Sequence, residues 1–293
     1  MSANDAATVL AEHVSGSSNA FANMMNEKAK EIGCLNTHFV NPNGVHNNNH
    51  YSTAYDLCLM ANYAMKNDTF REIVSTVSYT IPATNKYQER TIYNTNKLLH
   101  KSNIKTNTEN TYYYEYTTGI KTGYTPFAKN CLVASAKKDD IEFIAVILGA
   151  SEHESDNDSQ RYSDIKNLFE IAFQNYSLSP IKRANDVVTT VKIPNGNFIR
   201  KNLNLVLEKD ITTLVENEDL KTDIPCEINL EEDKIQAPIS KGDTMGTVTY
   251  TYDGISYTEN LLAANNVGTR EQMNNYLIVI IGILVILLTF VIF

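Results

Sequence analysis

Two tripeptides in this chain combine side chains that can bind a carboxylate and move a proton. Ser2-Ala3-Asn4 offers a hydroxyl and an amide, and Lys121-Thr122-Gly123 offers an ammonium group and a hydroxyl beside a glycine. A cation next to a hydroxyl donor suits a carboxylate ligand, and a lysine in an enclosed site can lower its pKa and act as a base. Each tripeptide is expected by chance in many proteins of this length, so their interpretation depends on their order and structural context.

The elements predicted around these tripeptides supply that context. Helical spacing covers residues 5–32 and, after an Asn-rich loop, residues 53–65. An amphipathic helix is predicted over 160–176, with Arg161 at its start. Between these helices, three short strands linked by tight turns are predicted at 119–125, 130–136 and 142–149. The Lys-Thr-Gly run therefore lies on a strand that a closing helix follows.

Two segments ahead of these strands have weaker patterns. Residues 73–84 alternate between apolar and polar side chains, as in a strand. Residues 100–116 are polar and Tyr-rich, which predicts an exposed loop in which Tyr112, Tyr113 and Tyr114 are either exposed or partly packed. Asn94 to Leu99 (NTNKLL) forms a third distinctive polar pattern in this region.

The last part of the chain has a different texture. From 183 to 266, short β-prone runs recur every 8–12 residues, which predicts a small β-sandwich or barrel after a linker at 179–182. Residues 276–293 (YLIVIIGILVILLTFVIF) contain no charge, and as a helix they would extend about 27 Å. That length matches a bilayer core, so we expect a transmembrane helix that contacts the lipid bilayer through Tyr276–Phe293.

Composition excludes several classes of function. The net charge is −9 and no basic run occurs, so nucleic-acid binding is not expected. The four cysteines form no CxxC pair, which argues against a zinc or thioredoxin-type site and predicts free thiols. His46 and His50 are four residues apart, but they lie in an Asn-rich loop with no carboxylate close by. We therefore expect neither a metal nor a cofactor. The first residues also lack the basic and apolar regions of a signal peptide.

The order of the two tripeptides, about 117 residues apart, resembles that of serine-type D-alanyl-D-alanine carboxypeptidases, the low-molecular-mass penicillin-binding proteins of peptidase family S11. Enzymes that react with penicillin complete a site around the nucleophile motif SxxK with an SxN and a KTG motif. The resemblance covers nearly the whole chain. It includes NTHFVNPNGV (36–45), HYSTAYDL (50–57), NTNKLL (94–99), TTGIKTGYT (117–125), LVASAKKDD (132–140) and APISKGDTMGTV (237–248).

This resemblance implies a fold and an activity. The fold implied for residues 1–178 is an α/β (α+β) transpeptidase/β-lactamase-like domain with an antiparallel sheet and helices, followed by the all-β sandwich predicted at 183–266 and the membrane helix predicted at 276–293. The activity is hydrolysis of the D-Ala-D-Ala end of peptidoglycan stem peptides through a serine acyl-enzyme that β-lactam antibiotics block. Such enzymes act on the cell wall, at the outer side of the cell membrane.

The resemblance also assigns roles to individual residues. For catalysis, Ser2 would relay protons, Asn4 would hydrogen-bond the acyl-side amide of the substrate, and Lys121 would hold positive potential near the nucleophile.

For substrate binding, Lys121 is joined by three further residues. Thr122 would bind the terminal carboxylate, Gly123 would let the strand approach the substrate closely, and Arg161 would add positive charge for that carboxylate.

The chain departs from the family in one respect: the family's SxxK precedes SxN, and here only Met1 does. Four other pairs have the SxxK spacing, but all follow SxN in a loop, turn, outer helix or linker: Ser102–Lys105, Ser135–Lys138, Ser163–Lys166 and Ser179–Lys182. We therefore expect the chain to be inactive alone.

Two alternatives to a carboxypeptidase were weighed. A β-lactamase would need a Glu with an Asn four residues later between the two motifs, and none occurs. A non-catalytic cell-wall binding or scaffold protein that retains the substrate groove stays open.

Overall fold

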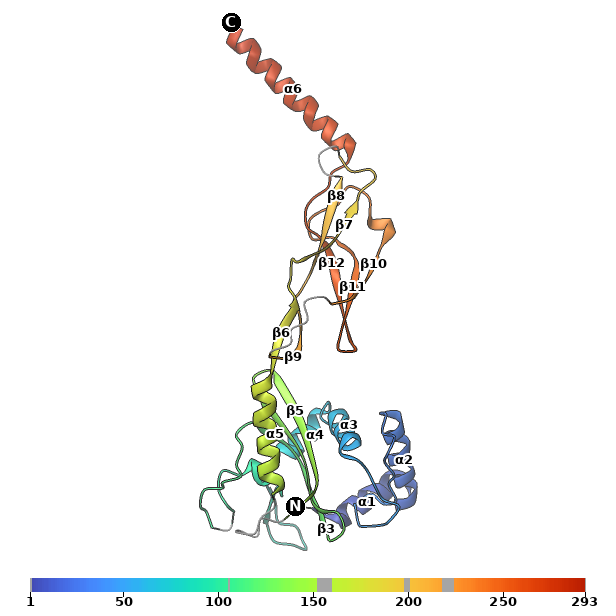
Figure 1. Ribbon diagram of the computed structural model, residues 1–293, viewed down its shortest axis with the longest axis vertical. Coiled ribbons are helices and arrows are strands. Elements are labelled where there is room, and N and C mark those ends of the chain that lie inside the picture. The colour runs from blue at the N-terminus through green and yellow to red at the C-terminus, as the bar shows by residue number, and fades with distance from the viewer. Residues whose placement is uncertain (1, 105, 152–159, 198–200, 218–223, 293) are drawn as a thin grey trace. The chain divides into compact units, whose positions relative to one another are not determined.

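The computed structural model describes residues 2–104, 106–151, 160–197, 201–217 and 224–292, with the side chains of 285–292 outside the description. The chain divides into two compact units, residues 1–175 and 176–293. The sequence predicted that the first domain ends at 178. Figure 1 labels many of the elements of each unit, and we describe the two units separately.

The first unit begins with two helices where the sequence predicted one over 5–32. Helix α1 covers Asn4–Ser15 and α2 covers Ser18–Glu31. Gly16 ends α1 in the left-handed conformation (φ 82°), and the Ser17 side chain caps the start of α2. The helix is therefore interrupted at Gly16, which has no β-carbon to oppose the left-handed conformation, and restarts at Ser17, whose hydroxyl accepts a hydrogen bond from the Ala20 N–H.

Short elements lead from these helices to the sheet. The predicted helix over 53–65 is confirmed as α3, with Thr53 as its N-cap. The strand predicted over 73–84 is wrong at its start, because those residues end α4, and only four of the others form β1. The elements are α3 (Ala54–Ala64), α4 (Asp68–Ser75), β1 (Ser78–Ile81), β2 (Arg90–Tyr93) and the 3-10 helix η1 (Lys97–Leu99).

The three predicted central strands are confirmed. They are β3 (Thr117–Thr125), β4 (Lys129–Lys138) and β5 (Ile141–Ala150), and they form an antiparallel sheet in that order. Alternate residues of β4 point to opposite faces of the sheet. Leu132, Ala134 and Ala136 pack with α5 (Arg161–Asn175), whereas Val133 packs with the group that includes residues of α3 and α4. The sheet is thus covered by helices on both faces (Figure 1).

The Tyr-rich loop before β3 is partly packed, which is one of the two states predicted for its tyrosines. Tyr114 is 5% exposed, and its ring stacks on Phe169 of α5 with centroids 5.8 Å apart. Burial raises the pKa of the Tyr114 hydroxyl. Residue 105 of this loop lies outside the described residues. Burial of this large ring against a core helix stabilises the folded protein. This gain outweighs the preference of the surrounding polar residues for solvent, so the segment packs on the helix.

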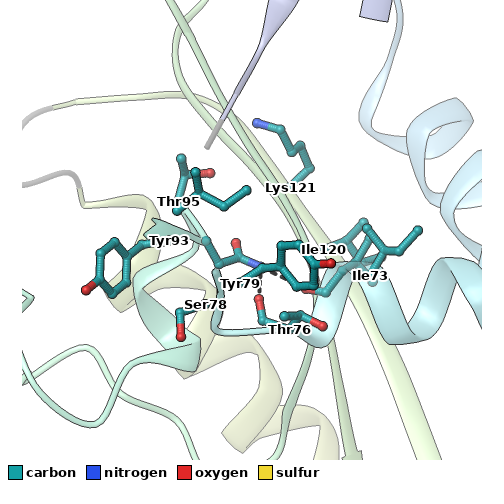
Figure 2. A pocket seen from close by; sticks show the side chains of 11 residues that line it. Ile73, Thr76, Ser78, Tyr79, Tyr93, Thr95, Ile120 and Lys121 are labelled. Carbon is teal, nitrogen blue, oxygen red and sulfur yellow. Dashed lines mark hydrogen bonds between the residues drawn. The ribbon is translucent and has the colours of Figure 1, made fainter. Parts of the chain in front are cut away.

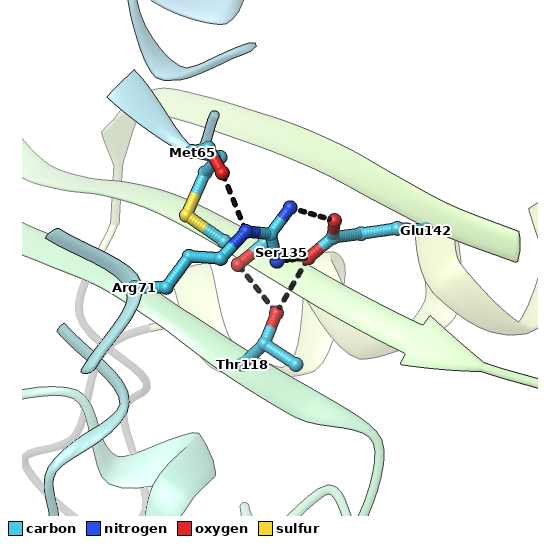
Figure 3. A network of polar contacts seen from close by, with 5 residues as sticks. All are labelled: Met65, Arg71, Thr118, Ser135 and Glu142. Atoms are coloured by element: carbon cyan, nitrogen blue, oxygen red, sulfur yellow. Dashed lines mark hydrogen bonds and ion pairs between the residues drawn. The ribbon is translucent and has the colours of Figure 1, made fainter. Parts of the chain in front are cut away.

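A bidentate ion pair joins α4 to the sheet (Figure 3). The Arg71 guanidinium donates two hydrogen bonds to the Glu142 carboxylate, at 2.9 and 2.5 Å, and a third to the backbone carbonyl of Met65. Thr118 of β3 also donates to Glu142, at 3.1 Å, and lies 2.8 Å from the Ser135 hydroxyl of β4. Burial alone would raise the pKa of Glu142, but the hydrogen bonds from Arg71 and Thr118 and the charge of Arg71 lower it.

Close packing between α4 and β3 requires a glycine at position 119. A β-carbon there would lie 2.7 Å from the Val74 Cγ2 atom, which is closer than carbon atoms can approach without displacement. Gly119 therefore lets α4 lie directly against the strand that carries Lys121.

The second unit contains the predicted all-β region. A five-stranded sheet has the order β10-β11-β12-β8-β7, and β6 pairs with β9 in a separate ribbon. Residues 179–182, predicted as a linker, belong to β6. The elements are β6 (Tyr176–Lys182), β7 (Val187–Lys192), β8 (Asn202–Leu207), β9 (Ile211–Glu216), β10 (Cys226–Leu230), the 3-10 helix η2 (Glu232–Lys234), β11 (Thr244–Tyr252) and β12 (Ile255–Ala263).

The last helix, α6 (Arg270–Ile292), forms over the predicted membrane segment. Within the part of the chain that the structure describes, however, no helix is both long enough and apolar enough to cross a membrane. The predicted transmembrane helix at 276–293 and its lipid contact are therefore not supported.

We expect replacement of Glu142 by glutamine to lower the free energy of unfolding by about 1–2 kcal/mol at pH 7, because the variant loses charge-assisted hydrogen bonds. The pKa of Glu142 is lowered in the folded protein, so its contribution is present above the pKa of an unfolded glutamate. This contribution is lost as the pH falls from about 4 through the folded pKa. Urea unfolding followed by circular dichroism at several pH values measures it.

Glu31→Gln is the matched control, because the Glu31 carboxylate is 63% exposed and pairs with Lys28 at the surface. Its unfolding curve should match the original protein at each pH. An equal loss in both variants would show that the partly buried, bidentate geometry of Glu142 contributes nothing beyond a surface ion pair.

Candidate active site

The Lys121-Thr122-Gly123 run occupies the middle of β3, which pairs only with β4 among the described strands. Lys121 lies opposite Val133, and Gly123 lies opposite Cys131. The residues from Lys121 to the end of the strand line a groove of about 950 Å³. An edge strand beside a groove can pair through its backbone with an extended peptide.

Five segments of the first unit line this groove. They are the start of α1, the loop at 43–46, residues near η1, β3 with its turn to β4, and the start of α5. All the predicted site residues are among the lining residues: Ser2, Asn4, Lys121, Thr122, Gly123 and Arg161. The structure brings these six residues to one cavity, and their individual roles stay predictions.

Lys121 has an altered acidity. Its Nζ atom donates to the backbone carbonyl of Thr122 at 2.7 Å. The side chain keeps contact with solvent in the open groove, but protein atoms surround the ammonium group closely enough that desolvation lowers its pKa, and the charge of Arg161 lowers it further. Lys121 therefore gives up its proton more readily than an ordinary surface lysine.

A series of hydrogen bonds connects Thr122 to α5. The Thr122 hydroxyl donates to the Thr95 hydroxyl at 2.6 Å, and the buried Tyr162 hydroxyl donates to the Thr95 carbonyl at 3.2 Å. Arg161 in turn donates to the Tyr162 hydroxyl at 3.2 Å. These contacts hold the hydroxyl of Thr122 in place beside the cationic side chains.

Arg161 is fixed by backbone carbonyls of two strands. Its Nη1 atom donates to Gly123 at 3.0 Å and to Cys131 at 3.1 Å. The guanidinium also lies over the Tyr162 ring, 4.9 Å from its centroid. The positive charge is thus held against the part of β3 that follows Lys121.

The loop that contributes residues 43–46 is anchored at its base. The buried carboxylate of Asp56 accepts hydrogen bonds from the Asn36 backbone N–H and the Thr37 hydroxyl, both at 2.7 Å. The bond from Thr37 lowers the pKa of Asp56 and, with the backbone N–H donors, outweighs the effect of burial. Asn26 of α2 exchanges two hydrogen bonds with the backbone of Phe39, at 2.7 and 2.8 Å.

Asparagine side chains brace the tip of this loop. Asn41 accepts from the Gly44 N–H and donates to the Val45 carbonyl, each at 2.8 Å. Asn43 accepts from the Val45 N–H and donates to the Thr8 hydroxyl of α1, each at 3.1 Å. The asparagine-rich composition, which predicted only a loop, therefore creates local turns that set its shape.

Sequence reasoning missed the supporting residues Thr95 and Tyr162, although the NTNKLL pattern indicated the region. Asn96 is fully buried and donates to the Gly119 carbonyl at 2.9 Å. Asn94 donates to the carbonyls of Val74 and Thr76, each at 3.0 Å. Two asparagines around one threonine thus attach Thr95 to both β3 and α4. The sequence signal that could have indicated a supporting role for this segment is the pair of closely spaced asparagines ahead of a predicted strand.

A second, apolar cavity of about 420 Å³ shares Thr95 and Lys121 with the groove. Figure 2 shows Thr95 and Lys121 along one side and Ile73, Ile120 and Tyr79 along another. The remaining lining residues come from α4, β1, β2 and the adjoining residues. Lys121 therefore forms part of the boundary of two cavities of different character.

The histidines of the loop have partners other than a metal. The backbone N–H of Val40 donates to the His50 Nδ1 atom at 3.2 Å, which requires that atom to be unprotonated. Burial, with the charges of His38 and His46, lowers the pKa of His50. The His46 ring stacks on Phe127. Among the described residues, no group of three or more His, Cys, Asp or Glu residues is arranged to hold a metal ion.

Comparison with protein families gives a match for each unit. Residues 1–152 match the family described as D-alanyl-D-alanine carboxypeptidase, and residues 176–269 match the C-terminal domain of penicillin-binding protein 5. The chain is 35% identical over 273 residues to D-alanyl-D-alanine carboxypeptidase DacF of Bacillus subtilis (strain 168), covering 93% of this chain. It spans 63% of the length of that relative.

Solved structures share the fold. Penicillin binding protein 5 from Haemophilus influenzae is 26% identical, with a TM-score of 0.54 and coverage of 91% of this chain and 71% of that one. A peptidoglycan synthesis regulatory factor (PBP3) from Streptococcus pneumoniae has a TM-score of 0.63 at 23% identity, with coverage of 91% and 74%. The second likeness concerns the fold alone.

Replacement of Arg161 by glutamine should raise the pKa of Lys121, because it removes a neighbouring positive charge. Desolvation, the larger cause, remains, so the pKa should stay below that of an ordinary lysine. Titration of ¹³C-methylated lysines by NMR measures the change, with Lys121→Arg used to assign the signal.

Arg90→Gln is the control, because Arg90 lies on β2 outside the residues that line the groove. It should leave the titration of Lys121 unaltered. A Lys121 pKa that falls or stays constant in Arg161→Gln would contradict the assigned electrostatic contact.

Proposed function

Because the chain belongs to the D-alanyl-D-alanine carboxypeptidase family, we propose that its groove binds the D-Ala-D-Ala end of a peptidoglycan stem peptide, as part of a serine-type carboxypeptidase that removes the terminal D-alanine. One observation carries this proposal: Lys121, Thr122 and Arg161 line a single groove, and no carboxylate occurs among its described lining residues. Such a groove favours a ligand that ends in a carboxylate.

The proposed binding mode uses the open edge of β3. The terminal carboxylate accepts a hydrogen bond from the Thr122 hydroxyl, within the positive potential of Lys121 and Arg161. The peptide backbone lies along β3, where Gly123 leaves room for close approach, and the Asn4 amide contacts the acyl side. Thr122 can turn from Thr95 to the ligand without loss of a hydrogen bond, because both are oxygen acceptors.

The proposed reaction is acyl transfer. A serine oxygen bonds to the penultimate carbonyl carbon, the C–N bond to D-alanine breaks, and the leaving amine takes up a proton. Water then attacks the ester, which releases the shortened peptide and restores the serine hydroxyl. Ser2 and Lys121 carry the protons between these groups. A β-lactam would acylate the same serine, because its ring amide resembles the bond that is cut.

None of the four Ser-x-x-Lys serines lines the groove. Ser135 is buried beside Thr118, Ser163 lies on α5, Ser179 lies on β6 of the second unit, and Ser102 lies in the loop before β3. Lys105, the partner of Ser102, lies outside the described residues. We therefore propose that residues 1–293 by themselves bind the peptide without acylation. The alternative of a non-catalytic cell-wall binding protein rests on the same observation.

The place of action follows from the proposed substrate. Peptidoglycan stem peptides lie outside the cytoplasmic membrane, so we propose that the first unit acts there.

We expect Thr122→Val to weaken binding of N-acetyl-D-Ala-D-Ala by about 10- to 100-fold, because the variant loses a hydrogen bond to a charged group without a change of shape. NMR titration of the labelled 293-residue chain measures the dissociation constant. Thr80→Val is the matched control: Thr80 pairs with Thr91 on the β1–β2 hairpin, outside the groove. Equal binding of N-acetyl-L-Ala-L-Ala, or of the C-terminal amide, would contradict the proposed substrate.

A labelled penicillin should form no covalent adduct with the 293-residue chain, because the groove lacks a described Ser-x-x-Lys nucleophile. Intact-protein mass spectrometry detects such an adduct. The same measurement on a chain extended by the Ser-x-x-Lys segment of a family relative should show one. An adduct on any residue within 1–293 would refute the claim, and no adduct on the extended chain would favour the non-catalytic alternative.

A further inference from the structure

The loop whose tip contributes residues 43–46 to the groove has two arms, one on each side of the tip, and hydrogen bonds join them. His38 and Tyr51 form an antiparallel bridge, with backbone hydrogen bonds of 2.9 and 3.0 Å between them. The Nδ1 atom of His38 lies 2.5 Å from the Asn49 carbonyl, and because that oxygen can only accept, His38 is the donor. The two arms are therefore held side by side.

A bond between Val40 and His50 joins the arms closer to the tip. The Val40 N–H of the first arm donates to the His50 Nδ1 atom of the second arm at 3.2 Å. The His50 backbone N–H donates to the Asn47 carbonyl at 2.8 Å, and the His50 ring meets the Phe39 ring edge-on, with centroids 5.4 Å apart. The imidazole is thus placed with one nitrogen directed at a backbone donor.

This arrangement requires His50 to be neutral. A neutral imidazole that carries its hydrogen on Nε2 can accept at Nδ1, whereas an imidazolium carries hydrogen on both nitrogens and accepts at neither. Protonation of His50 would set two donors against each other and leave the Val40 N–H without its partner, which is costly for a partly buried group. The bond from His38 to Asn49 differs, because His38 donates in either protonation state.

The groups around His50 disfavour its charged form. Burial lowers the pKa of His50, and the imidazoles of His38 and His46 lower it further. Both histidines belong to the same loop, and among the described residues no carboxylate or ammonium group of another element acts on this pKa. His50 is therefore neutral at pH 7 and takes up a proton only below the ordinary histidine value of about 6.5.

We propose that the hydrogen bond from Val40 to His50 is a pH-sensitive switch, which holds the tip of the loop in place at neutral pH and releases it in acid. The contribution of this bond is complete above about pH 6.5 and is lost as the pH falls through the lowered pKa of His50. The tip lines the groove, so its release also weakens ligand binding there. Only this last consequence rests on the proposed function.

Amide hydrogen exchange of the 293-residue chain, followed by NMR between pH 7.5 and pH 4.5, tests the switch without a ligand. Protection factors, which correct for the intrinsic pH dependence of exchange, should fall about tenfold at Val40, the equivalent of one hydrogen bond. The fall should extend to Gly44 and Val45 at the tip, and its midpoint should coincide with the titration of the His50 ring signals. Amides of β4, which are bonded within the sheet, should keep their protection.

Two variants of His50 separate the hydrogen bond from the charge. His50→Asn keeps an acceptor oxygen near the position of Nδ1 and cannot titrate, so Val40 should stay protected throughout the pH range. His50→Phe keeps a ring but no acceptor, so Val40 should lose protection even at pH 7.5. His13→Asn is the matched control, because it removes an exposed histidine of α1, and it should behave as the original chain.

The outcomes separate this proposal from the proposed function. Constant protection of Val40 over the pH range, or the same acid-induced loss in His50→Asn, would refute the switch. The affinity for N-acetyl-D-Ala-D-Ala should also fall about tenfold in acid, and His50→Asn should prevent this fall. The ligand carboxylate stays ionised over this range, because its pKa is about 3.5. Absence of ligand binding at every pH would contradict the proposed function alone, since the exchange measurement uses no ligand.

Discussion

The pairing of Arg71 with Glu142 is the contact on which the position of β3 depends. Through it, α4 is attached to β5, and Thr118 brings β3 into the same network. Packing by apolar side chains alone tolerates small shifts, whereas a planar guanidinium and a carboxylate meet in one orientation. The residues that follow Thr118 on β3 include Lys121 and Thr122. The direction in which they face the groove is therefore set a few residues earlier, by residues that do not line the groove.

The groove is held by two different kinds of interaction. On the β3 side, regular strand pairing with β4 is supplemented by Arg161, which binds carbonyls of both strands. On the loop side, where regular structure is absent between Leu35 and Thr53 apart from one bridge, side-chain amides and the Asp56 carboxylate satisfy the backbone. Both kinds of interaction hold a wall of the groove in place. The loop wall depends on individual side chains, so its conformation is more sensitive to substitution.

Local patterns in the sequence predicted most of the regular elements of the first unit and the grouping of its polar motifs. Short β-prone runs linked by tight turns predicted β3, β4 and β5, and the helical spacing of Ile165, Leu168, Phe169, Ala172 and Phe173 predicted α5. The break at Gly16 was visible as a glycine followed by a capping serine, but helical periodicity on both sides concealed it.

Other features depend on contacts between distant residues, which periodicity does not encode. Tyr114 is buried because Phe169 lies beneath it, and Thr95 reaches Thr122 because Asn94 and Asn96 attach it to neighbouring elements. The stack of His46 on Phe127 has no local signal at all. For the candidate site, the motif residues were thus predictable, whereas the residues that hold them in place were not.

The apolar cavity beside Lys121 links hydrophobic contact to acid–base behaviour. Because Lys121 borders both this cavity and the groove, any apolar group that fills the cavity removes water from around the lysine's methylene chain and reduces the solvation of its ammonium group. Desolvation already lowers the pKa of this lysine, and further loss of water acts in the same direction. An apolar contact, which involves no charge and no hydrogen bond, can therefore change the pKa of the lysine that borders both the cavity and the groove.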